Sequence, residues 1–521
     1  MRLIDLLMVF LSSVTVGCSS RGYLACEQNS NCDLASGGVC SDPGTGSRWC
    51  AYPDANCPSC YRYSNVQVGD GVSGVCVETV DGGVDDGGVQ EVPGPFGTLA
   101  IRIGGNETSG SDVPMCVTSA GSDVVITGIL NQSADLGGGS LIGTFLVKYN
   151  SDGVHVWSKS WGLNIGFADV RADGNGDVLV TGHVEGSANL GCGPITANSH
   201  GEFLLAKFDG RNGACKWSIH AGTGDTADGR NIAVAGTDLI VTGNFGGNSG
   251  SGTITLGTSL LTSGGLIDIF VGRFEGATGH AVWATSFPGT KNDYVSDIVN
   301  VDESSFAIAG FFFGGTLAIG TSTLTGQAFV SRYKSDGSGP IWVQQYSSGG
   351  VGDPHGLASL PSGDLALATN FSSSSITFGD FTLQGVGSTM AIVRLDGSNG
   401  KAISGTAYGN HTAVTSAGLV SLPNGNLAGV AQFGGTLAFG NTNLNAGAGS
   451  ALAVFQLTPE GAPMSAKRYG GNEPDFATCA RACVSNEIVL TGTYDHAIDF
   501  GASAPLSSLG SRTIFAARVS P

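Results

Sequence analysis

The sequence has 521 residues, of which 85 are glycine, 12% are charged and 41% are hydrophobic. This hydrophobic content is too high for a disordered chain, and the length suits several small domains or one large β domain. The formal net charge of −19 opposes binding to phosphate backbones and anionic bilayers, so nucleic acid is excluded as the predicted partner.

Residues 1–18 are predicted to be an export signal. A basic residue, Arg2, precedes an apolar run from Leu6 to Leu11, and small residues lead to Cys18. The segment "TVGC" resembles a bacterial lipobox, which implies that Cys18 becomes lipidated. No apolar run long enough to span a membrane follows residue 20, so we expect membrane contact through the lipid anchor only. The predicted location is the outer membrane or cell surface, with ordinary secretion or a misassigned start codon as alternatives.

Residues 19–76 contain seven cysteines in a segment with too few aliphatic side chains to build a core of its own. Disulfide bonds are predicted to stabilise it, because its single Cys-Pro-Ser-Cys motif lacks the second ligand pair of a zinc site. We therefore predict no metal. An odd count of seven requires a free thiol or a bridge to one of the five later cysteines. The predicted disulfide cysteines are Cys26, Cys32, Cys40, Cys50, Cys57, Cys60, Cys76, Cys116, Cys192, Cys215, Cys479 and Cys483.

Residues 77–95 are acidic and glycine-rich and lack hydrophobic periodicity, so they are predicted to form a flexible linker. From residue 96 to residue 521 the sequence repeats. Seven runs of β-forming residues end in Thr-Gly or a substitute, from "DVVITG" at 123–128 to "EIVLTG" at 487–492. A second set of seven runs ends in glycines spaced 57 to 67 residues apart.

Each repeat contains four strand-like runs of period two and no helical pattern. This is typical of a propeller blade, so the predicted fold class is an all-β, seven-bladed β-propeller. The last repeat stops after its third strand, and "TLAIRIGG" supplies an isolated fourth strand near residue 100, which should complete the last blade. Runs such as Phe433–Gly440 and Phe313–Gly320 are predicted to be turns. Four tryptophans are predicted to pack between blades, with a ligand-stacking row as the alternative: Trp157, Trp217, Trp283 and Trp342.

The repeat resembles the bacterial seven-bladed β-propeller repeat of secreted and lipid-anchored proteins. The segments "DGNGDVLVTGHVEG" and "LIDIFVGRFEGATGHAVWATSFPG" match that pattern best. The cysteine-rich segment resembles small disulfide modules that precede such propellers in myxobacterial exported proteins. These resemblances imply the propeller fold and an exported location, and they imply little about activity.

The run "DGNGD" at residues 173–177 has two interpretations. Asp173, Asn175 and Asp177 are spaced like the oxygen ligands of calcium, whereas the same residues before an apolar run are typical of a hairpin turn. The corresponding positions in other repeats, such as "SAGSD" and "LPNGN", keep turn-forming residues and lose carboxylates. A hairpin turn is therefore predicted, and calcium at this copy is the alternative.

The connections between blades, and those between the second and third strands, should emerge on one face of the ring, which we call the loop face. The residues predicted to bind a ligand there, near the mouth of the central channel, are Asp169, Asp228, Arg230, Asp297, His355, His411 and Asp475. The alternative for each of them is a solvated turn residue.

No sequence motif for a nucleophile, a metalloprotease or a phosphate-binding loop occurs, so we predict no catalytic residue and no cofactor. The predicted function is a monomeric, non-enzymatic binding or scaffold protein for an extracellular protein or glycan. One alternative is a polysaccharide hydrolase or lyase with a carboxylate pair at the channel mouth. A passive spacer is the other.

Overall fold

The computed structural model describes residues 99–104, 112–222, 225–247, 252–348, 353–409, 414–470, 475–483, 485–501, 505–508 and 513–521, and the backbone of four short strands before residue 94. The chain forms two compact units, Met1–Asp86 and Gly87–Pro521. In the first unit, β1 (Val39–Ser41), β2 (Trp49–Pro53) and β3 (Tyr61–Tyr63) form an antiparallel sheet in which Cys40 is paired in register with Cys50.

The export signal, the lipidation site Cys18 and most of the linker lie outside the described residues. So do five predicted disulfide cysteines, namely Cys26, Cys32, Cys57, Cys60 and Cys76. Export, lipid anchoring and these pairings therefore stay predictions. No helix in the described ranges has the length and apolarity that crossing a bilayer requires.

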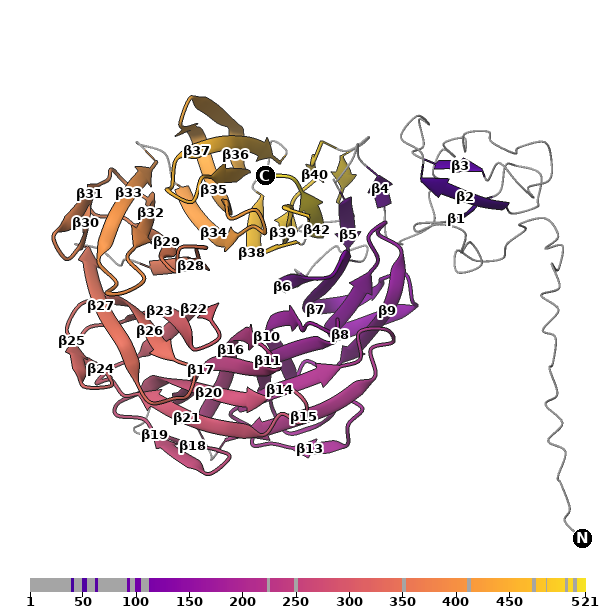
Figure 1. The fold of residues 1–521 in the computed structure, drawn as a ribbon. Coiled ribbons are helices and arrows are strands. Elements are labelled where there is room, and N and C mark those ends of the chain that lie inside the picture. The colour runs from indigo at the N-terminus through magenta and orange to yellow at the C-terminus, as the bar shows by residue number, and fades with distance from the viewer. Residues whose placement is uncertain are drawn as a thin grey trace, which may run out of the picture. The chain divides into compact units, whose positions relative to one another are not determined.

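The second unit is an all-β propeller of seven antiparallel blades, which confirms the predicted fold (Figure 1). The first, innermost strands of blades 1 to 7 are β6 (Val113–Ala120), β10 (Ile165–Ala172), β16 (Thr226–Ala235), β22 (Asp293–Asp302), β28 (Asp353–Ser359), β34 (Val414–Ser421) and β38 (Phe476–Ala482). The second strands are β7 (Asp123–Asp135), β11 (Val178–Val184), β17 (Asp238–Gly246), β23 (Ser305–Phe312), β29 (Leu365–Phe371), β35 (Leu427–Phe439) and β39 (Ile488–Tyr494).

The outer half of each blade follows the same order. The third strands are β8 (Ser140–Tyr149), β14 (Glu202–Phe208), β20 (Ile267–Glu275), β26 (Ala328–Lys334), β32 (Thr389–Leu395), β36 (Thr442–Leu457) and β42 (Thr513–Val519). The fourth strands are β9 (His155–Trp161), β15 (Cys215–Ala221), β21 (Ala281–Phe287), β27 (Pro340–Ser348), β33 (Ala402–Tyr408), β37 (Pro463–Tyr469) and β5 (Leu99–Ile103).

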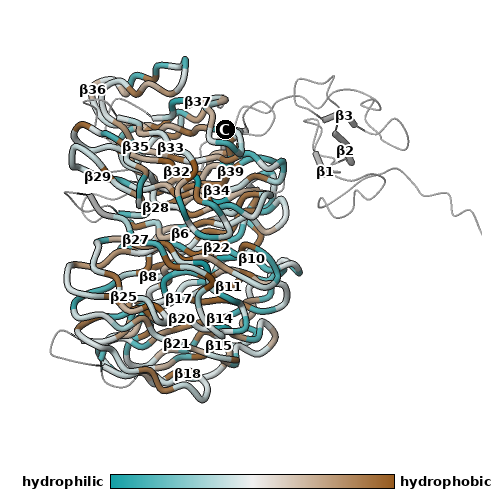
Figure 2. The backbone as a smooth tube through the Cα atoms, turned by 60° about the vertical axis from the view of Figure 1, so that its left-hand side comes forward, coloured by the Kyte–Doolittle hydropathy of each residue, from teal (hydrophilic) through white to brown (hydrophobic). Residues whose placement is uncertain are grey.

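The hydrophobic core lies between the blades. Each inner strand packs against the inner strand of the next blade, and β38 packs against β6 to complete the ring. Buried side chains form clusters shared by neighbouring sheets; for example, Phe203 of blade 2 and Phe270 of blade 3 pack edge to face, with ring centroids 5.1 Å apart. Figure 2 shows hydrophobic segments in strands throughout the ring. Alternating side chains thus bury both faces of each sheet.

The ring closes with the N-terminal strand, as predicted. Strand β5 pairs with β42, the third strand of blade 7, from Leu99 opposite Arg518 to Ile103 opposite Ile514. Strand β4 (Glu91–Pro93) then pairs with β5 at the outer edge.

Two disulfide bonds occur in the propeller. Cys116–Cys479 joins inner strands β6 and β38, which are the first and last inner strands of the ring and lie 363 residues apart in sequence. Cys192–Cys215 closes a loop of blade 2 with a separation of 23 residues. Cys483 is a free buried thiol, so its prediction as a disulfide partner is wrong. Its burial raises the pKa of the thiol to about 12.

A repeated polar contact joins blades 1 to 4 to their successors. In blade 1, Trp157 Nε1 and Lys148 Nζ both donate to the backbone carbonyl of Gly210 in blade 2, at 3.1 and 2.8 Å. In blades 2 to 4 the tryptophan and the third-strand Lys or Arg likewise share one carbonyl of the next blade. The four shared acceptors are the carbonyls of Gly210, Gly276, Ser335 and Gly397. The predicted inter-blade role of the tryptophans is confirmed.

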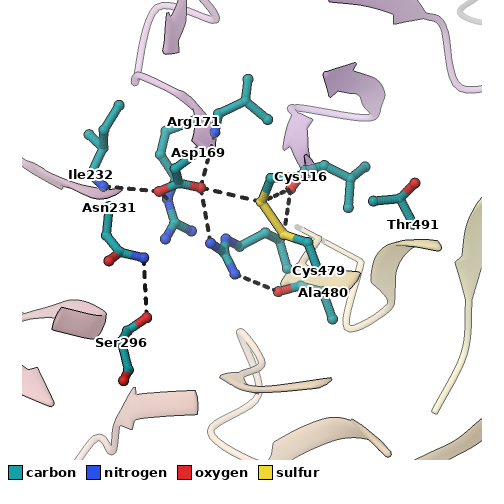
Figure 3. Close-up of a disulfide and its surroundings, with 12 residues drawn as sticks. Cys116, Asp169, Arg171, Asn231, Ile232, Ser296, Cys479, Ala480 and Thr491 are labelled. Atoms are coloured by element: carbon teal, nitrogen blue, oxygen red, sulfur yellow. Dashed lines mark hydrogen bonds and ion pairs between the residues drawn. A yellow bond between two sulfur atoms is a disulfide. The ribbon is translucent and has the colours of Figure 1, made fainter. Parts of the chain in front are cut away.

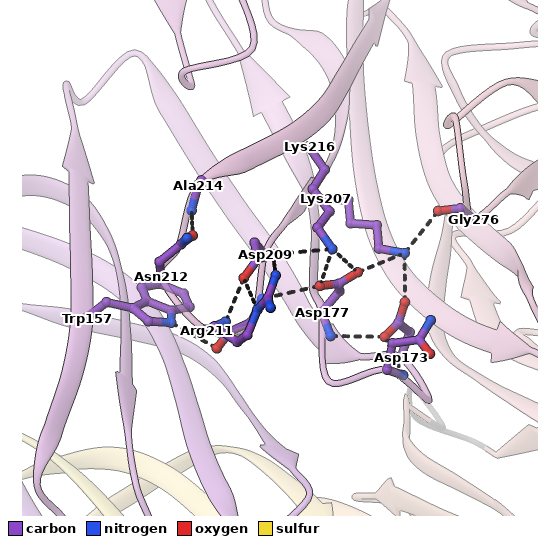
Figure 4. Close-up of polar contacts among 12 residues, drawn as sticks. Trp157, Asp173, Asp177, Lys207, Asp209, Arg211, Asn212, Ala214, Lys216 and Gly276 are labelled. Atoms are coloured by element: carbon purple, nitrogen blue, oxygen red, sulfur yellow. Dashed lines mark hydrogen bonds and ion pairs between the residues drawn. The ribbon is translucent and has the colours of Figure 1, made fainter. Parts of the chain in front are cut away.

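The segment 173–177 is the hairpin turn between β10 and β11, as predicted. The Asp173 N–H donates to the Asp177 carbonyl at 3.0 Å, and Asp173 Oδ1 accepts from the backbone N–H groups of Asn175 and Asp177. Lysine ammonium groups neutralise both carboxylates, because Lys207 Nζ lies 2.7 Å from Asp173 Oδ2 and Lys216 Nζ lies 2.6 Å from Asp177 Oδ2 (Figure 4).

The connections between second and third strands form small hairpins in five blades, not the simple turns predicted for Phe313–Gly320 and similar runs. These hairpins are β12–β13 (Ser187–Asn189, Pro194–Thr196), β18–β19 (Thr253–Leu256, Ser259–Thr262), β24–β25 (Leu317–Ile319, Ser322–Leu324), β30–β31 (Ser375–Phe378, Phe381–Gln384) and β40–β41 (Ala497–Ile498, Leu506–Ser507). In blade 6, Phe433–Gly440 mostly continues strand β35. Hairpin β30–β31 of blade 5 pairs with β27 of blade 4, so it also ties neighbouring blades together.

Replacing Gly279 should destabilise the propeller through a contact between blades. Gly279 has a φ of +77°, and a Cβ added to it would lie 2.7 Å from the Trp217 ring. We expect Gly279→Ala to cost about 1–3 kcal/mol of overpacking in addition to the left-handed backbone strain. Gly236→Ala is the matched control, because Gly236 has a φ of +64° and open space around its Cα. Equal losses of unfolding free energy in urea for the two variants would contradict this explanation.

The ring-closing disulfide should stabilise the fold more than the local one. Because Cys116–Cys479 spans 363 residues and Cys192–Cys215 spans 23, loop-closure entropy favours the first. We expect the double variant Cys116→Ala/Cys479→Ala to lose about 2 kcal/mol more than Cys192→Ala/Cys215→Ala in non-reducing denaturation. A smaller loss for the ring-closing pair would rule out this entropic account.

Candidate functional site

Every inner strand carries a β-bulge opposite the Thr-Gly position of the repeat. In blade 2, Phe167 pairs with Gly182 and Asp169 pairs with Thr181, which leaves Ala168 as the extra residue. The extra residues of blades 1 to 7 are Met115, Ala168, Arg230, Ser296, His355, Ala417 and Thr478. A bulge re-aims the side chains around it, so seven aligned bulges change what the channel wall presents.

A cavity of about 590 Å³ lies inside the ring, and residues from all seven inner strands line it. Four of the predicted binding residues are brought together on its wall, namely Asp169, Arg230, Asp297 and His355. Arg230 and His355 are bulge residues, and each aspartate directly follows a bulge. A cavity of this size is within the range of small-molecule sites.

Asp169 is the centre of an ion cluster in the cavity wall (Figure 3). Its carboxylate is 1% exposed and lies 3.1 Å from Arg171 Nε and 3.0 Å from Arg481 Nη2. The same carboxylate accepts from the N–H groups of Val170 and Ile232, the second of which belongs to the next blade. Asp169 therefore links three blades, since Arg481 is in blade 7. Its oxygens are fully committed to these partners.

Asp297 occupies the equivalent position in blade 4. It accepts from its own neighbour, Ile298 N–H, and from Leu357 N–H in the next blade, both at 2.9 Å. Burial raises the pKa of Asp297, and the charges of Arg481 and Arg171 oppose that rise. Burial also lowers the pKa of the Arg171 guanidinium, and the nearby Arg481 lowers it further. The two carboxyl groups of Asp169 and Asp297 are thus matched in number by the guanidinium groups of Arg171 and Arg481.

The remaining charged residues near the loop face form exposed pairs. Arg230 Nη2 lies 3.1 Å from Asp228 Oδ2, and His183 Nδ1 lies 3.6 Å from Asp228 Oδ1. The neighbouring Asp228 carboxylate raises the pKa of His183. On the other side of the cavity, His355 Nε2 lies 3.1 Å from Asp353 Oδ2.

Three predicted binding residues do not line the cavity. Asp228 lies behind Arg230 as its ion-pair partner. Asp475 is completely buried and precedes β38, so its predicted place at the channel mouth is wrong. His411 lies outside the described residues.

Sequence reasoning missed the aromatic part of the site. Tyr294 and Phe311 line the cavity, and Phe313 is next to them. The one available signal was the run "FFFGG" at 311–315, which places three phenylalanines at the loop-face end of β23. Arg481, Asn231 and Asn244 in the cavity wall were not predicted either, because no local sequence pattern marks a strand side chain that reaches the cavity.

A pair of carboxyl groups lies between blades 3 and 4, at Asp268 and Asp293, and both residues are fully buried. Burial raises the pKa of Asp268, and the Gly289 N–H, which donates to Asp268 Oδ1 at 2.9 Å, opposes that rise. Burial and the neighbouring Asp268 raise the pKa of Asp293 to about 9. The arrangement suits a shared proton inside the protein, and its burial keeps substrate away.

Asp293→Asn should flatten the pH dependence of stability. The folded chain keeps a proton on Asp293 up to a pKa of about 9, whereas an unfolded aspartate releases it near a pKa of about 3.9. Between these values, stability should fall as pH rises, by up to about 1.4 kcal/mol per pH unit, and asparagine removes this dependence. Urea denaturation from about pH 5 to about pH 8 measures it. Asp380→Asn on the surface is the control, and an unchanged slope for Asp293→Asn would contradict the shared-proton explanation.

No protein-family model matches this sequence, and a comparison with curated proteins finds no match. Among solved structures, BamB from Moraxella catarrhalis is 13% identical, with a TM-score of 0.36 over 83% of this chain and 97% of BamB. The S511A mutant of puromycin hydrolase complexed with PGG is 12% identical, with a TM-score of 0.44 over 77% of this chain and 55% of that one. The Neurospora crassa Pan2 WD40 domain is 9% identical, with a TM-score of 0.39 over 78% of this chain and 89% of that domain. Likeness at this level assigns neither activity nor partner.

Proposed function

We propose that this chain is an exported, lipid-anchored propeller that acts as a non-enzymatic binding or scaffold protein. Its partner is an extracellular protein or glycan that contacts the loop face and the cavity behind it. The observation that carries the proposal is the set of seven aligned bulges, which brings residues from all seven blades, and polar or charged side chains from blades 2 to 7, to one cavity. Sites on a rigid scaffold of this kind are suited to binding.

A binding role is favoured over hydrolysis by the state of the carboxylates. A glycosidase needs one carboxyl that can donate a proton and a second that can attack or activate water. Asp169 already accepts two arginine and two backbone donors, and Asp297 accepts two backbone N–H groups. Asp228 is held by Arg230. These contacts give Asp169 and Asp297 a structural role between blades and pair Asp228 with a cation of its own strand.

Removing the charged bulge side chains should weaken binding at the loop face. We expect Arg230→Ala/His355→Ala to weaken by at least about tenfold any interaction found with the chain from Gly22 onward, because one good charge-assisted contact contributes about 1.4 kcal/mol or more. The measurement is a glycan and polysaccharide array, read with and without chelator and followed by product analysis.

The matched control is Arg211→Ala/His280→Ala. Both residues are exposed, and both lie in connections between third and fourth strands, on the opposite face. Equal binding by the two double variants would place the interaction elsewhere, and released oligosaccharides would refute the non-enzymatic proposal. Loss of binding in the presence of chelator would support the alternative of a calcium site at residues 173–177. If no sugar on the array binds, a protein remains the proposed partner. Surface crosslinking with the same variants then identifies it.

A further inference from the structure

We propose that the cavity binds a neutral saccharide against the wall formed by blades 3 and 4. This inference rests on the proposed function, because it names the ligand class of the same site. Three independent features of that wall support it: an aromatic cluster at the rim, acceptor atoms of fixed orientation deeper in, and charges that are already paired.

The aromatic cluster consists of Tyr294, Phe311 and Phe313. The rings of Tyr294 and Phe311 stack with centroids 5.4 Å apart and an interplanar angle of 29°. Phe313 meets both rings edge-on, at 6.0 and 5.5 Å, and 53% of it is exposed. An exposed aromatic surface beside a polar cavity suits the apolar C–H face of a pyranose ring, which otherwise carries hydroxyl groups.

Two asparagines next to this cluster, Asn231 and Asn244, are among the residues that line the cavity. Asn244 Nδ2 donates to the Asp293 carbonyl at 2.8 Å, and Asn231 Nδ2 donates to the Ser296 carbonyl at 3.4 Å. These bonds fix the orientation of both amides, so each Oδ1 can act only as an acceptor. Neither Oδ1, nor Ser296 Oγ, has a hydrogen-bond partner within the described part of the chain. Each of these three oxygens has less than 1 Å² of accessible surface and lacks a partner, so each gains a hydrogen bond from a ligand hydroxyl that reaches it through a small local adjustment of the cavity wall.

The charges of the cavity argue for a neutral ligand. Asp169 is paired with Arg481, Arg230 with Asp228, and His355 with Asp353. An anionic ligand would compete with these carboxylates and face the two asparagine oxygens, to which it offers no donor. A cationic ligand would meet Arg230 and Arg481. A polyhydroxylated neutral molecule donates to the free acceptors, accepts from N–H groups of Arg230 that its pair with Asp228 does not use, and leaves every ion pair intact.

The size of the cavity limits the ligand to a short oligosaccharide or the end of a longer chain. Its volume is about 590 Å³, and sites of ~300–1,000 Å³ bury most of a ligand of drug size. Tyr294 lies at the loop-face end of β22, and Phe313 directly follows the loop-face end of β23, so a longer glycan can continue outward from the rim.

Isothermal titration calorimetry of the chain from Gly22 onward tests the inference. The probes are maltotriose, cellotriose, laminaritriose and chitotriose, with trigalacturonic acid as an anionic analogue. We expect at least one neutral trisaccharide to bind, and the anionic analogue to bind at least about tenfold more weakly. Phe313→Ala should weaken binding by about three- to tenfold, since an aromatic contact contributes about 0.5–1.5 kcal/mol. Ser296→Ala should weaken it by a similar factor through loss of a hydroxyl contact.

Leu260→Ala is the matched control for Phe313→Ala, because Leu260 is 66% exposed and lies in hairpin β18–β19. Leu260→Ala should bind as tightly as the unaltered chain. All variants should keep the circular dichroism spectrum and melting temperature of the unaltered chain. Three results would overturn the inference: no binding of any neutral probe, stronger binding of trigalacturonic acid, or affinities unaffected by both cavity variants. If an anionic glycan or a protein instead binds in a way that depends on Arg230 and His355, the proposed function stands and only the saccharide assignment fails.

Discussion

A propeller blade is stable only when both of its faces are covered, so the whole structure depends on closing the ring between the last blade and the first. An open ring would expose two hydrophobic sheet faces and unpaired strand edges. In this structure two separate connections close the ring. Strand β5 completes blade 7 at the outside, and Cys116–Cys479 joins the inner strands at the channel. The cavity exists because this joint holds all seven bulged strands around one axis.

The features predicted correctly from sequence are those that repeat along the chain. Blade number, the closing strand and the packing of Trp157 between blades follow from spacing, because each copy must bury the same surfaces. The bulges escaped prediction, since one extra residue barely disturbs a period of two. The glycine of the Thr-Gly pair was their signal. A Cβ on Gly182 would collide with the carbonyl oxygen of Gly166, where the bulged inner strand approaches its neighbour.

The site was predicted only in part, because loop position does not determine the direction of a side chain. Arg230 and His355 reach the cavity, whereas Asp475 is buried in the protein. The Asp268–Asp293 pair joins residues from different blades, which no local pattern in the sequence connects. The net charge of the whole chain did not predict the charge balance around the cavity. A chain of net charge −19 surrounds a cavity lined by Asp169, Asp297 and Arg481, and the charge of Arg171, which pairs with Asp169, completes the balance.

The double closure has a mechanical consequence. A tensile load applied to the chain ahead of β4 acts first on β4 and β5, the outermost strands of blade 7. Because β5 lies antiparallel to β42, its hydrogen bonds resist such a load together when it is directed along the strand. If β5 is nevertheless pulled away, the covalent bond between Cys116 and Cys479 still holds the inner strands at the axis. The propeller can therefore lose its outer strand under force without opening its channel, and can recover when β5 pairs again.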